Sequence, residues 1–136
     1  ENLHMIFYRD VSAAGLDIAP NQAIKSVHRI LSNFRMPGST VPELRRKAVV
    51  IATGGIYDPR IHLEDVVMPI LKKWRIFERD DFTGEGARMR DELGMLVADL
   101  EQTCVKFEEA KARKLDRDAK LAEKRAAKSL LASAAS

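Results

Sequence analysis

Glu1 and His4 are the two residues of this sequence with the clearest potential for metal chemistry, because a carboxylate and an imidazole stand three positions apart. Each residue of an α-helix advances by about 100°, so both side chains project from the same face. Together they can bind one metal ion, or the carboxylate can bridge two. A hard carboxylate with a borderline imidazole suits iron or manganese. Glu-x-x-His also arises by chance in helices rich in Glu, so the spacing alone is weak evidence.

The sequence around this pair predicts a helix over residues 1–16. Apolar side chains occupy the faces outside the Glu1–His4 arc: Leu3, Met5, Ile6, Phe7, Ala13, Ala14 and Leu16. This pattern is typical of a helix in the middle of a bundle, which packs on its neighbours while it holds polar ligands inward. Tyr8 lies one turn beyond His4, where it can hydrogen-bond a metal ligand, but a core tyrosine with its hydroxyl at the rim is the commoner case.

A second helix is predicted over residues 22–34, with Asn21 as its N-cap. Its apolar stripe at helical spacing consists of Ala23, Ile24, Val27, Ile30, Leu31 and Phe34. A cluster of turn residues at positions 36–40 separates this helix from the next.

Two further helices begin with a proline in the first turn. Pro42 suits the start of a helix that runs to about Ala52, and the glycines at positions 54–55 end it. Asp58 followed by Pro59 repeats the start signal, an N-cap and then a proline at the first helical position.

The helix that begins at Pro59 carries a proline in its interior. Its expected buried face consists of Leu63, Val66, Val67, Ile70, Leu71 and Trp74. Pro69 lacks a backbone N–H, so the carbonyl of Asp65 loses its partner and the helix should bend or open locally.

The last and longest helix is expected to follow a loop over residues 83–86. Its apolar stripe consists of Met89, Leu93, Leu96, Leu100, Cys104 and Phe107. Past about Arg113 this pattern gives way to Lys, Arg, Asp, Glu and Ala. We therefore divide the chain into a folded part, residues 1–113, and a basic, Ala-rich, disordered tail, residues 114–136.

Composition limits the class of protein. The 136 residues, of which 46% are hydrophobic, are enough for one all-α domain or a part of one. The single cysteine, Cys104, excludes internal disulfides and favours a reducing, cytoplasmic setting, and no apolar run is long enough to span a membrane. The net charge of +3 suits nucleic acid, an anionic membrane or an acidic protein, and most of the excess lies after Lys106.

The other polar residues give weaker signals. His28 and His62 have no acid at metal spacing, so we expect surface or boundary positions for them. The basic clusters Arg45-Arg46-Lys47 and Lys72-Lys73-Arg75 can dock an acidic carrier protein or nucleic acid, but most such clusters are solvated faces. We assign no catalytic nucleophile, no phosphate loop at Gly84-x-Gly86 and no further cofactor-binding residue.

Several segments resemble one protein family. The run from Glu1 to Arg9 resembles the second Glu-x-x-His helix of the soluble, stearoyl-type acyl-(acyl-carrier-protein) desaturases. The segments 35–38, 67–75 and 82–86 also resemble the C-terminal part of that family, especially its actinobacterial branch. The resemblance runs from residue 1 to about residue 110.

The resemblance implies a fold and an activity. The fold is a ferritin-like di-iron helix bundle, of which this chain holds the C-terminal helices. The implied activity is the insertion of a cis double bond into a saturated acyl chain on acyl carrier protein. It uses two iron ions, dioxygen and a ferredoxin-type electron donor in a homodimer. Glu1 and His4 would be two of the six metal ligands of such a site, and an upstream part of the protein or a second chain would supply the others.

Two other functions remain open from the sequence alone. One is a metal-free helical module whose basic C-terminal stretch binds an acidic partner or nucleic acid. The other is a ferritin-like di-iron protein with different chemistry. The resemblance itself implies neither nucleic-acid binding nor a membrane span, and it leaves acyl chain length and double-bond position undetermined.

Overall fold

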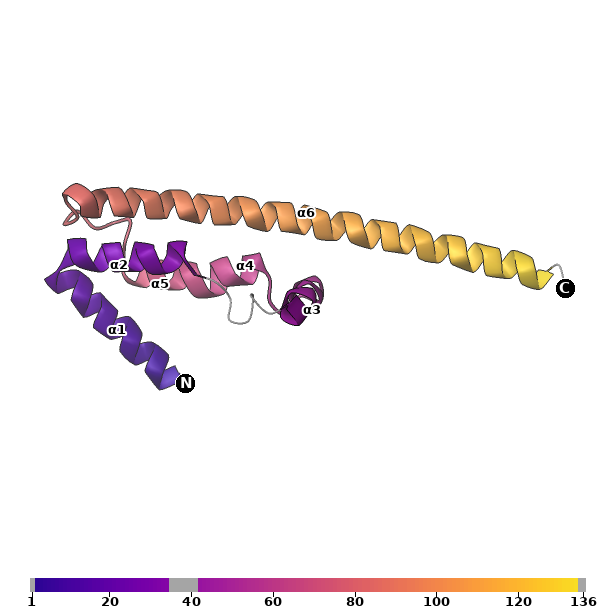
Figure 1. Cartoon of the computed structure of the whole chain (residues 1–136), viewed down its shortest axis with the longest axis horizontal. Coiled ribbons are helices and arrows are strands. Elements are labelled where there is room, and N and C mark those ends of the chain that lie inside the picture. The colour runs from indigo at the N-terminus through magenta and orange to yellow at the C-terminus, as the bar shows by residue number, and fades with distance from the viewer. Residues whose placement is uncertain (1, 35–41, 135–136) are drawn as a thin grey trace.

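The computed structural model describes residues 2–34 and 42–134 of the chain (Figure 1). The elements in these two ranges are α1 (Asn2–Ile18), α2 (Pro20–Ser32), α3 (Pro42–Thr53), α4 (Pro59–Ile61), the π-helix η1 (His62–Val67), α5 (Met68–Lys73) and α6 (Gly84–Ala134). Because α4, η1 and α5 are continuous, the described residues form five helical segments, and none of them forms a β-strand. The predicted all-α fold is therefore confirmed.

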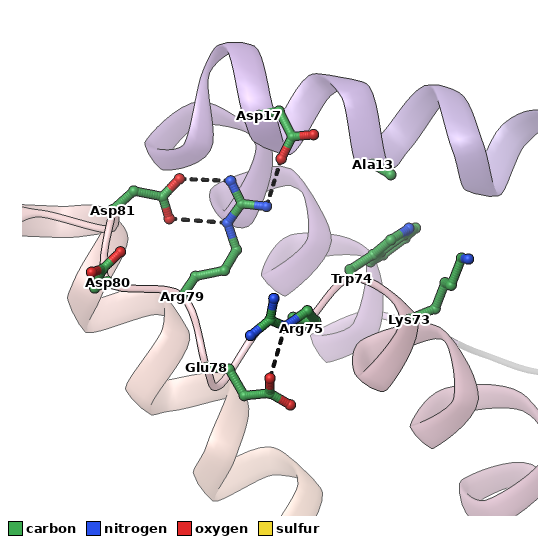
Figure 2. A pocket seen from close by; sticks show the side chains of 9 residues that line it. All are labelled: Ala13, Asp17, Lys73, Trp74, Arg75, Glu78, Arg79, Asp80 and Asp81. Atoms are coloured by element: carbon green, nitrogen blue, oxygen red, sulfur yellow. Dashed lines mark hydrogen bonds and ion pairs between the residues drawn. The ribbon is translucent and has the colours of Figure 1, made fainter.

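Helix α6 is the long element against which α2, α4 and η1 pack. Helix α2 lies along its first half, and α4 and η1 contact it further along (Figure 1). Helix α1 packs against α2 near the short connection between them and then runs away from this layer. The connection between α5 and α6 returns to α1, where Arg79 contacts Asp17 (Figure 2).

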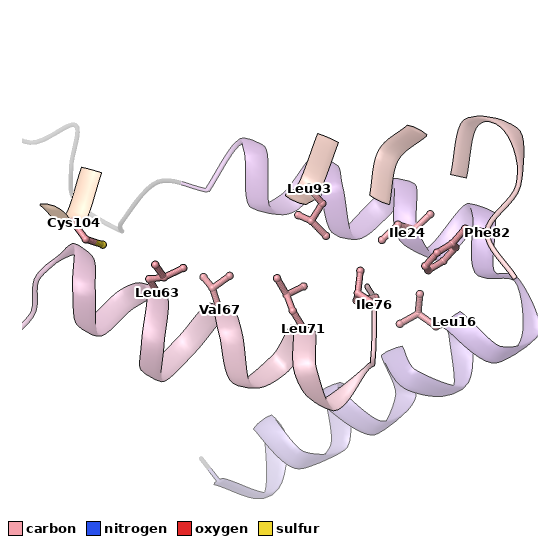
Figure 3. Packing of buried hydrophobic residues seen from close by; sticks show 9 residues of the cluster. All are labelled: Leu16, Ile24, Leu63, Val67, Leu71, Ile76, Phe82, Leu93 and Cys104. Carbon is pink, nitrogen blue, oxygen red and sulfur yellow. The ribbon is translucent and has the colours of Figure 1, made fainter. Parts of the chain in front are cut away.

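A row of buried apolar side chains joins these elements (Figure 3). Its members are Leu16, Ile24, Leu63, Val67, Leu71, Ile76, Phe82, Leu93 and Cys104. Most of them lie on the stripes predicted from helical spacing. Ile76 and Phe82 were not predicted, because they belong to the α5–α6 connection and have no periodic pattern around them.

Three residues predicted on apolar stripes are exposed instead. Val66 is 40% exposed, because the π-helical turn in which it lies rotates its side chain relative to a regular α-helix. Ile30 and Phe34, near or beyond the end of α2, are 62% and 51% exposed. The ring of Phe34 stacks on His62, at 5.1 Å between ring centroids, and covers that side chain rather than the core.

The predicted opening before Pro69 takes the form of the π-helix η1. In this stretch the N–H of Met68 donates to the carbonyl of Leu63, five residues back. Wide turns of this kind accommodate a position where the regular bonding pattern fails, and Pro69 has no N–H to continue it. The start at Asp58 is also as predicted, since its carboxylate accepts the N–H of Ile61 at 3.0 Å.

Two predicted helix boundaries were wrong, and one contact explains both. Helix α2 starts at Pro20 with Ala19 as its cap, so Asn21 is not the N-cap. The Asn21 amide instead donates to the Thr83 hydroxyl at 2.9 Å, and its oxygen accepts the Thr83 N–H at 2.9 Å. With Thr83 fixed in this way, its carbonyl accepts the N–H of Gly86 at 2.9 Å, and α6 begins at Gly84 rather than after a loop.

Helix α6 continues without a break through residue 113 to Ala134. The side chains from position 112 to position 131 are exposed, so this half of the helix adds nothing to the apolar core (Figure 1). No helix in the described part of the chain is long and apolar enough to cross a membrane. The predicted turn at residues 36–40 lies outside the described residues.

Candidate metal-binding helix

Of the two predicted metal ligands, the structure describes His4, and Glu1 lies outside the described residues. His4 lies near the start of α1, inside the helix predicted over residues 1–16, and its side chain is exposed. No hydrogen bond or ion pair is formed by its imidazole within residues 2–34 and 42–134. No group of three or more His, Cys, Asp or Glu side chains in this part of the chain is arranged to hold a metal ion.

The apolar side chains around His4 are exposed as well. Leu3, Phe7 and Tyr8 are 81%, 60% and 66% exposed, and the ring of Phe7 touches only the edge of Tyr8 among aromatic groups described here. The prediction that this helix is buried on most sides is wrong within this chain. The reason is geometric, because the N-terminal part of α1 runs away from α2 (Figure 1).

The middle and the C-terminal end of α1 are attached to the rest of the fold in three places. Leu16 is fully buried in the apolar core. The indole N–H of Trp74 donates to the backbone carbonyl of Arg9 at 3.0 Å. The guanidinium of Arg79 donates to the carbonyl of Leu16 at 3.0 Å and to Asp17 at 2.8 Å. These contacts fix the direction in which α1 carries His4.

Arg79 is the central charge of this attachment (Figure 2). Besides Asp17, it binds Asp81 through two nitrogens, at 2.6 and 2.9 Å. The hydrogen bonds that Arg79 donates to these two carboxylates raise its pKa above the usual value, and the guanidinium lowers the pKa of Asp81. Arg79 therefore stays charged and is occupied by protein groups, so it is not a free anion-binding group.

An open cleft of about 550 Å³ lies beside this attachment (Figure 2). It is lined by Ala13, Asp17, Lys73, Trp74, Arg75, Glu78, Arg79, Asp80 and Asp81. Seven of these nine side chains are charged, with both signs present. Such a lining suits water and ions and does not suit an apolar chain, and neither His4 nor Tyr8 belongs to it.

Arg75, at the edge of this cleft, has a backbone conformation that is rare for a non-glycine residue. Its φ is +52°, and the turn it forms returns the N–H of Ile76 to the carbonyl of Leu71 and its own N–H to Lys72. This pair of hydrogen bonds is the Schellman motif, and it ends α5. The motif recurs at the end of α3 with Gly55, whose φ is +73°.

The basic clusters found in the sequence are only partly described. Lys72, Lys73 and Arg75 are exposed at the end of α5, and the Arg75 side chain pairs with Glu78 at 2.8 Å. In the other cluster Lys47 is exposed on α3, while the side chains of Arg45 and Arg46 lie outside what the structure describes.

Ion pairs between residues far apart in the sequence were not predicted. Arg60 binds Glu101 and Glu108 of α6 at 2.5 and 2.8 Å, and these bonds raise its pKa while they lower that of Glu108. His28 lies 3.3 Å from Glu92, again on α6. The partners are 41 or more residues apart in the chain, so no local spacing could have indicated them.

His62 and Cys104 occupy sheltered positions with no sign of catalysis. The Tyr57 hydroxyl lies 2.7 Å from His62 Nδ1, and burial lowers the pKa of this histidine and raises that of Tyr57. Cys104 is fully buried, as predicted, and burial raises the pKa of its thiol, which makes it an inert part of the core.

Comparison with known proteins shows which family and which curated proteins this chain resembles. The fatty acid desaturase family model matches residues 1–124 of the chain. Two curated proteins from Mycobacterium tuberculosis, strains CDC 1551 / Oshkosh and H37Rv, are 69% identical to it over 124 residues, or 91% of this chain. Both carry the provisional name acyl-[acyl-carrier-protein] desaturase DesA1. The chain spans 37% of the length of these relatives, and no solved structure gives a significant match.

Proposed function

This chain belongs to the fatty acid desaturase family, and from that membership we propose that it is part of an acyl-(acyl-carrier-protein) desaturase. The observation that carries the proposal is the 69% identity over 124 residues to relatives provisionally named as enzymes of this kind. The all-α structure, with its projecting helix α1, agrees with the ferritin-like bundle expected for such a protein. The reaction would convert two adjacent methylenes of a carrier-bound acyl chain into a cis double bond.

Two iron ions would be the cofactor, and His4 with Glu1 would contribute two of their ligands. The donor set fits: His4 on α1, an imidazole without a described partner, and the carboxylate of Glu1 three positions before it in the sequence match the Glu-x-x-His ligand pattern of di-iron bundles. When bound, the iron pair would supply oxidation of the acyl chain by dioxygen. In the overall reaction the chain would lose two hydrogen atoms, a donor would provide two electrons and two protons, and dioxygen would be reduced to two water molecules.

The residues of this chain would act by holding the ligand helix in place. Trp74 and Arg79 bind the backbone of α1 at Arg9 and Leu16, and Leu16 anchors the helix in the core. A fixed helix axis keeps the ligand side chains close to their binding geometry, which saves ordering entropy when the metal binds. Tyr8, one turn from His4 on α1, would hydrogen-bond a metal ligand.

The remaining partners follow from the same proposal. The upstream part of the protein would supply the other ligands and would cover the exposed apolar side chains of α1, among them Leu3 and Phe7. Acyl carrier protein would present the substrate, a ferredoxin-type protein would deliver electrons, and the enzyme would be a cytoplasmic homodimer. A metal site shared among helices needs this surrounding protein, because residues 2–34 and 42–134 contain no complete ligand set.

The test uses the complete protein that contains this chain, loaded with iron and supplied with dioxygen, reduced ferredoxin and saturated acyl carriers. We expect an unsaturated product, identified by mass spectrometry of the released fatty acids. Removing a residue that hydrogen-bonds a metal ligand typically lowers metal affinity or activity by about 10- to 100-fold, and removing a ligand itself should lower them at least as much. His4→Ala and Glu1→Gln should therefore lower the iron content, and they should lower turnover by on the order of 100-fold.

His28→Ala is the matched control, because this histidine lies on α2 beside Glu92 and away from α1. It should leave the iron content unchanged. Full iron content in the His4→Ala protein would reject the ligand assignment. Iron binding without any desaturated product would instead favour a di-iron protein of different chemistry.

A further inference from the structure

Two aromatic residues that flank α3 in the sequence both contact the side chain of His62. The ring of Phe34, before α3, stacks on the imidazole with 5.1 Å between ring centroids and 12° between ring planes. The hydroxyl of Tyr57, after α3, lies 2.7 Å from His62 Nδ1. The chain therefore departs from this imidazole and returns to it. We call Phe34, Tyr57 and His62 the His62 cluster, and residues 42–56 the α3 segment.

His62 itself belongs to the layer that is packed on the core. Its N–H donates to the carbonyl of Asp58 at 3.0 Å, in the first turn of the helix that continues into η1. The carboxylate of Asp58 accepts the N–H of Ile61 at 3.0 Å and starts the same turn. The next residue, Leu63, is buried in the apolar core. Phe34 and Tyr57 therefore attach the two sides of the α3 segment to a fixed point.

The α3 segment has little packing of its own. None of the side chains that the structure describes in α3 is buried, and the apolar core draws its members from the other elements. Val50 and Ile56 are 71% and 74% exposed. Helix α3 lies beside α4 and is turned across the direction of the other helices (Figure 1). Lys111 of α6 also reaches this segment, since its amine lies 3.9 Å from where a Cβ on Gly55 would be.

A short helix of this kind needs attachment to the rest of the protein. Helix α3 has 12 residues, and an isolated helix of that length is marginal in water. Parts of a protein with few buried contacts open at a lower free energy than the core does. The α3 segment is therefore the place where this chain should open first, and the His62 cluster joins both of its sides.

We propose that the α3 segment is a conformational unit that opens and closes separately from the apolar core, and that the His62 cluster holds it closed. Loss of the contacts at His62 frees both sides of the segment while the buried residues of α2, η1 and α6 keep their packing. Elements that move when a protein binds its partners are drawn from such parts of low local stability. The α3 segment is thus the part of this chain that changes position most easily on binding.

This unit is independent of the metal site. None of the residues in the His62 cluster lies on α1 or belongs to the groups that attach α1 to the fold. Opening of the α3 segment can be measured without iron or substrate, so it stands or falls separately from the desaturase function.

The experiment follows amide hydrogen exchange by mass spectrometry in the complete protein that contains this chain. His62→Ala removes both contacts of the cluster. The amides of residues 42–56 should then exchange at least about fivefold faster, while those of α2 and of residues 84–104 change by less than about twofold. Buried Cys104 reports on the core, and its labelling by a thiol reagent, read on its own peptide, should change by less than about twofold.

Matched variants separate the contacts. His28→Ala is the control, because this histidine lies on α2 at 3.3 Å from Glu92, and it should change the exchange of residues 42–56 by less than about twofold. Tyr57→Phe removes the hydroxyl and keeps the ring, whereas Phe34→Leu removes the stacked ring. Each should accelerate exchange in residues 42–56 by at least about twofold, and by less than His62→Ala does.

Unchanged exchange of residues 42–56 in His62→Ala would overturn the proposal, because the cluster would then not hold the segment. Equal acceleration in residues 42–56, in α2 and in residues 84–104, with a reactive Cys104, would also overturn it, because the segment would open only together with the core. If circular dichroism shows that His62→Ala does not fold, Tyr57→Phe decides. Faster exchange confined to residues 42–56 supports the proposal, and unchanged or uniformly faster exchange rejects it.

Discussion

The indole N–H of Trp74 donates a hydrogen bond of 3.0 Å to the backbone carbonyl of Arg9, which joins the end of α5 to the middle of α1. Trp74 is also packed against the apolar core. A single side chain thus links the candidate ligand helix to the core that α2, α5 and α6 build around it.

Replacing Trp74 by phenylalanine tests this link. The substitution keeps an apolar ring and removes the donor, so we expect the free energy of unfolding to fall by about 1 kcal/mol, the usual worth of one hydrogen bond. Trp74→Ala should cost clearly more, because packing is lost as well. Urea unfolding followed by circular dichroism measures both, and an unchanged free energy of unfolding in Trp74→Phe would mean that the hydrogen bond contributes nothing.

The left-handed backbone conformation of Arg75 is expected to lower the free energy of unfolding. A left-handed conformation costs a non-glycine residue about 1–2 kcal/mol, so Arg75→Gly should stabilise the chain, by about 1 kcal/mol after the extra freedom of glycine in the unfolded state is counted. The exposed pair with Glu78 offsets little of this gain. Gly55→Ala, at the equivalent position of the α3 turn, is the mirror test and should destabilise by a similar amount. A loss of stability in Arg75→Gly would contradict this account.

Gly86 should not accept even one methyl group. A Cβ there would lie 2.0 Å from the Asn21 side-chain oxygen and 3.0 Å from its Cα, so Gly86→Ala must break the contact between Asn21 and Thr83. We expect a loss of about 2 kcal/mol in unfolding free energy, within the range for overpacked sites.

Gly94 is the control in the same helix. The nearest atom to a Cβ at this position is in the Phe77 ring, at an ordinary distance of 3.6 Å. Gly94→Ala should therefore be neutral or should stabilise by up to about 1 kcal/mol, from helix propensity alone. Similar losses in the two variants would show that close contact at Gly86 is not the cause.

Stability should fall as the solution becomes acidic, because of His62. Burial lowers its pKa in the folded state below the ordinary value of 6.5, so between these two values the unfolded chain binds more protons than the folded one. The stability contribution is complete above about pH 7 and is lost as the pH falls through 6.5 toward the folded-state pKa. Urea midpoints measured from pH 8 to pH 5 should show this loss in the parent chain and a smaller one in His62→Phe. The same slope in both would assign the effect elsewhere.

Residues 114–134 should exchange their amide hydrogens much faster than residues 84–104. Their side chains are exposed, so this half of α6 has helix propensity but no packing to hold it, whereas the first half is anchored by Leu93 and Cys104. Hydrogen exchange followed by mass spectrometry compares the two segments directly. Equal protection would show that the tail is stably ordered and would contradict the expected division at residue 113.

Local sequence patterns determined most of the helices. Helical spacing of apolar residues placed the stripes of α2, η1 with α5, and α6, and Cys104 on the buried side of the last. Asp58 with Pro59 and the glycines at 54–55 marked boundaries correctly, because these signals act within one turn of the backbone. The Glu1–His4 pair also needed only its spacing to be recognised as a candidate, and it stays a prediction, since Glu1 lies outside the described residues.

Tertiary structure alone decided the long-range contacts. Asn21 binds Thr83 rather than capping its own helix, Arg60 meets Glu101 and Glu108, and the first half of α1 is left exposed. The physical reason is that a polar side chain takes the best partner the fold brings near it, and that partner can be 62 residues away. Periodicity tells which side of a helix is apolar, but only the packed arrangement decides whether another element covers that side.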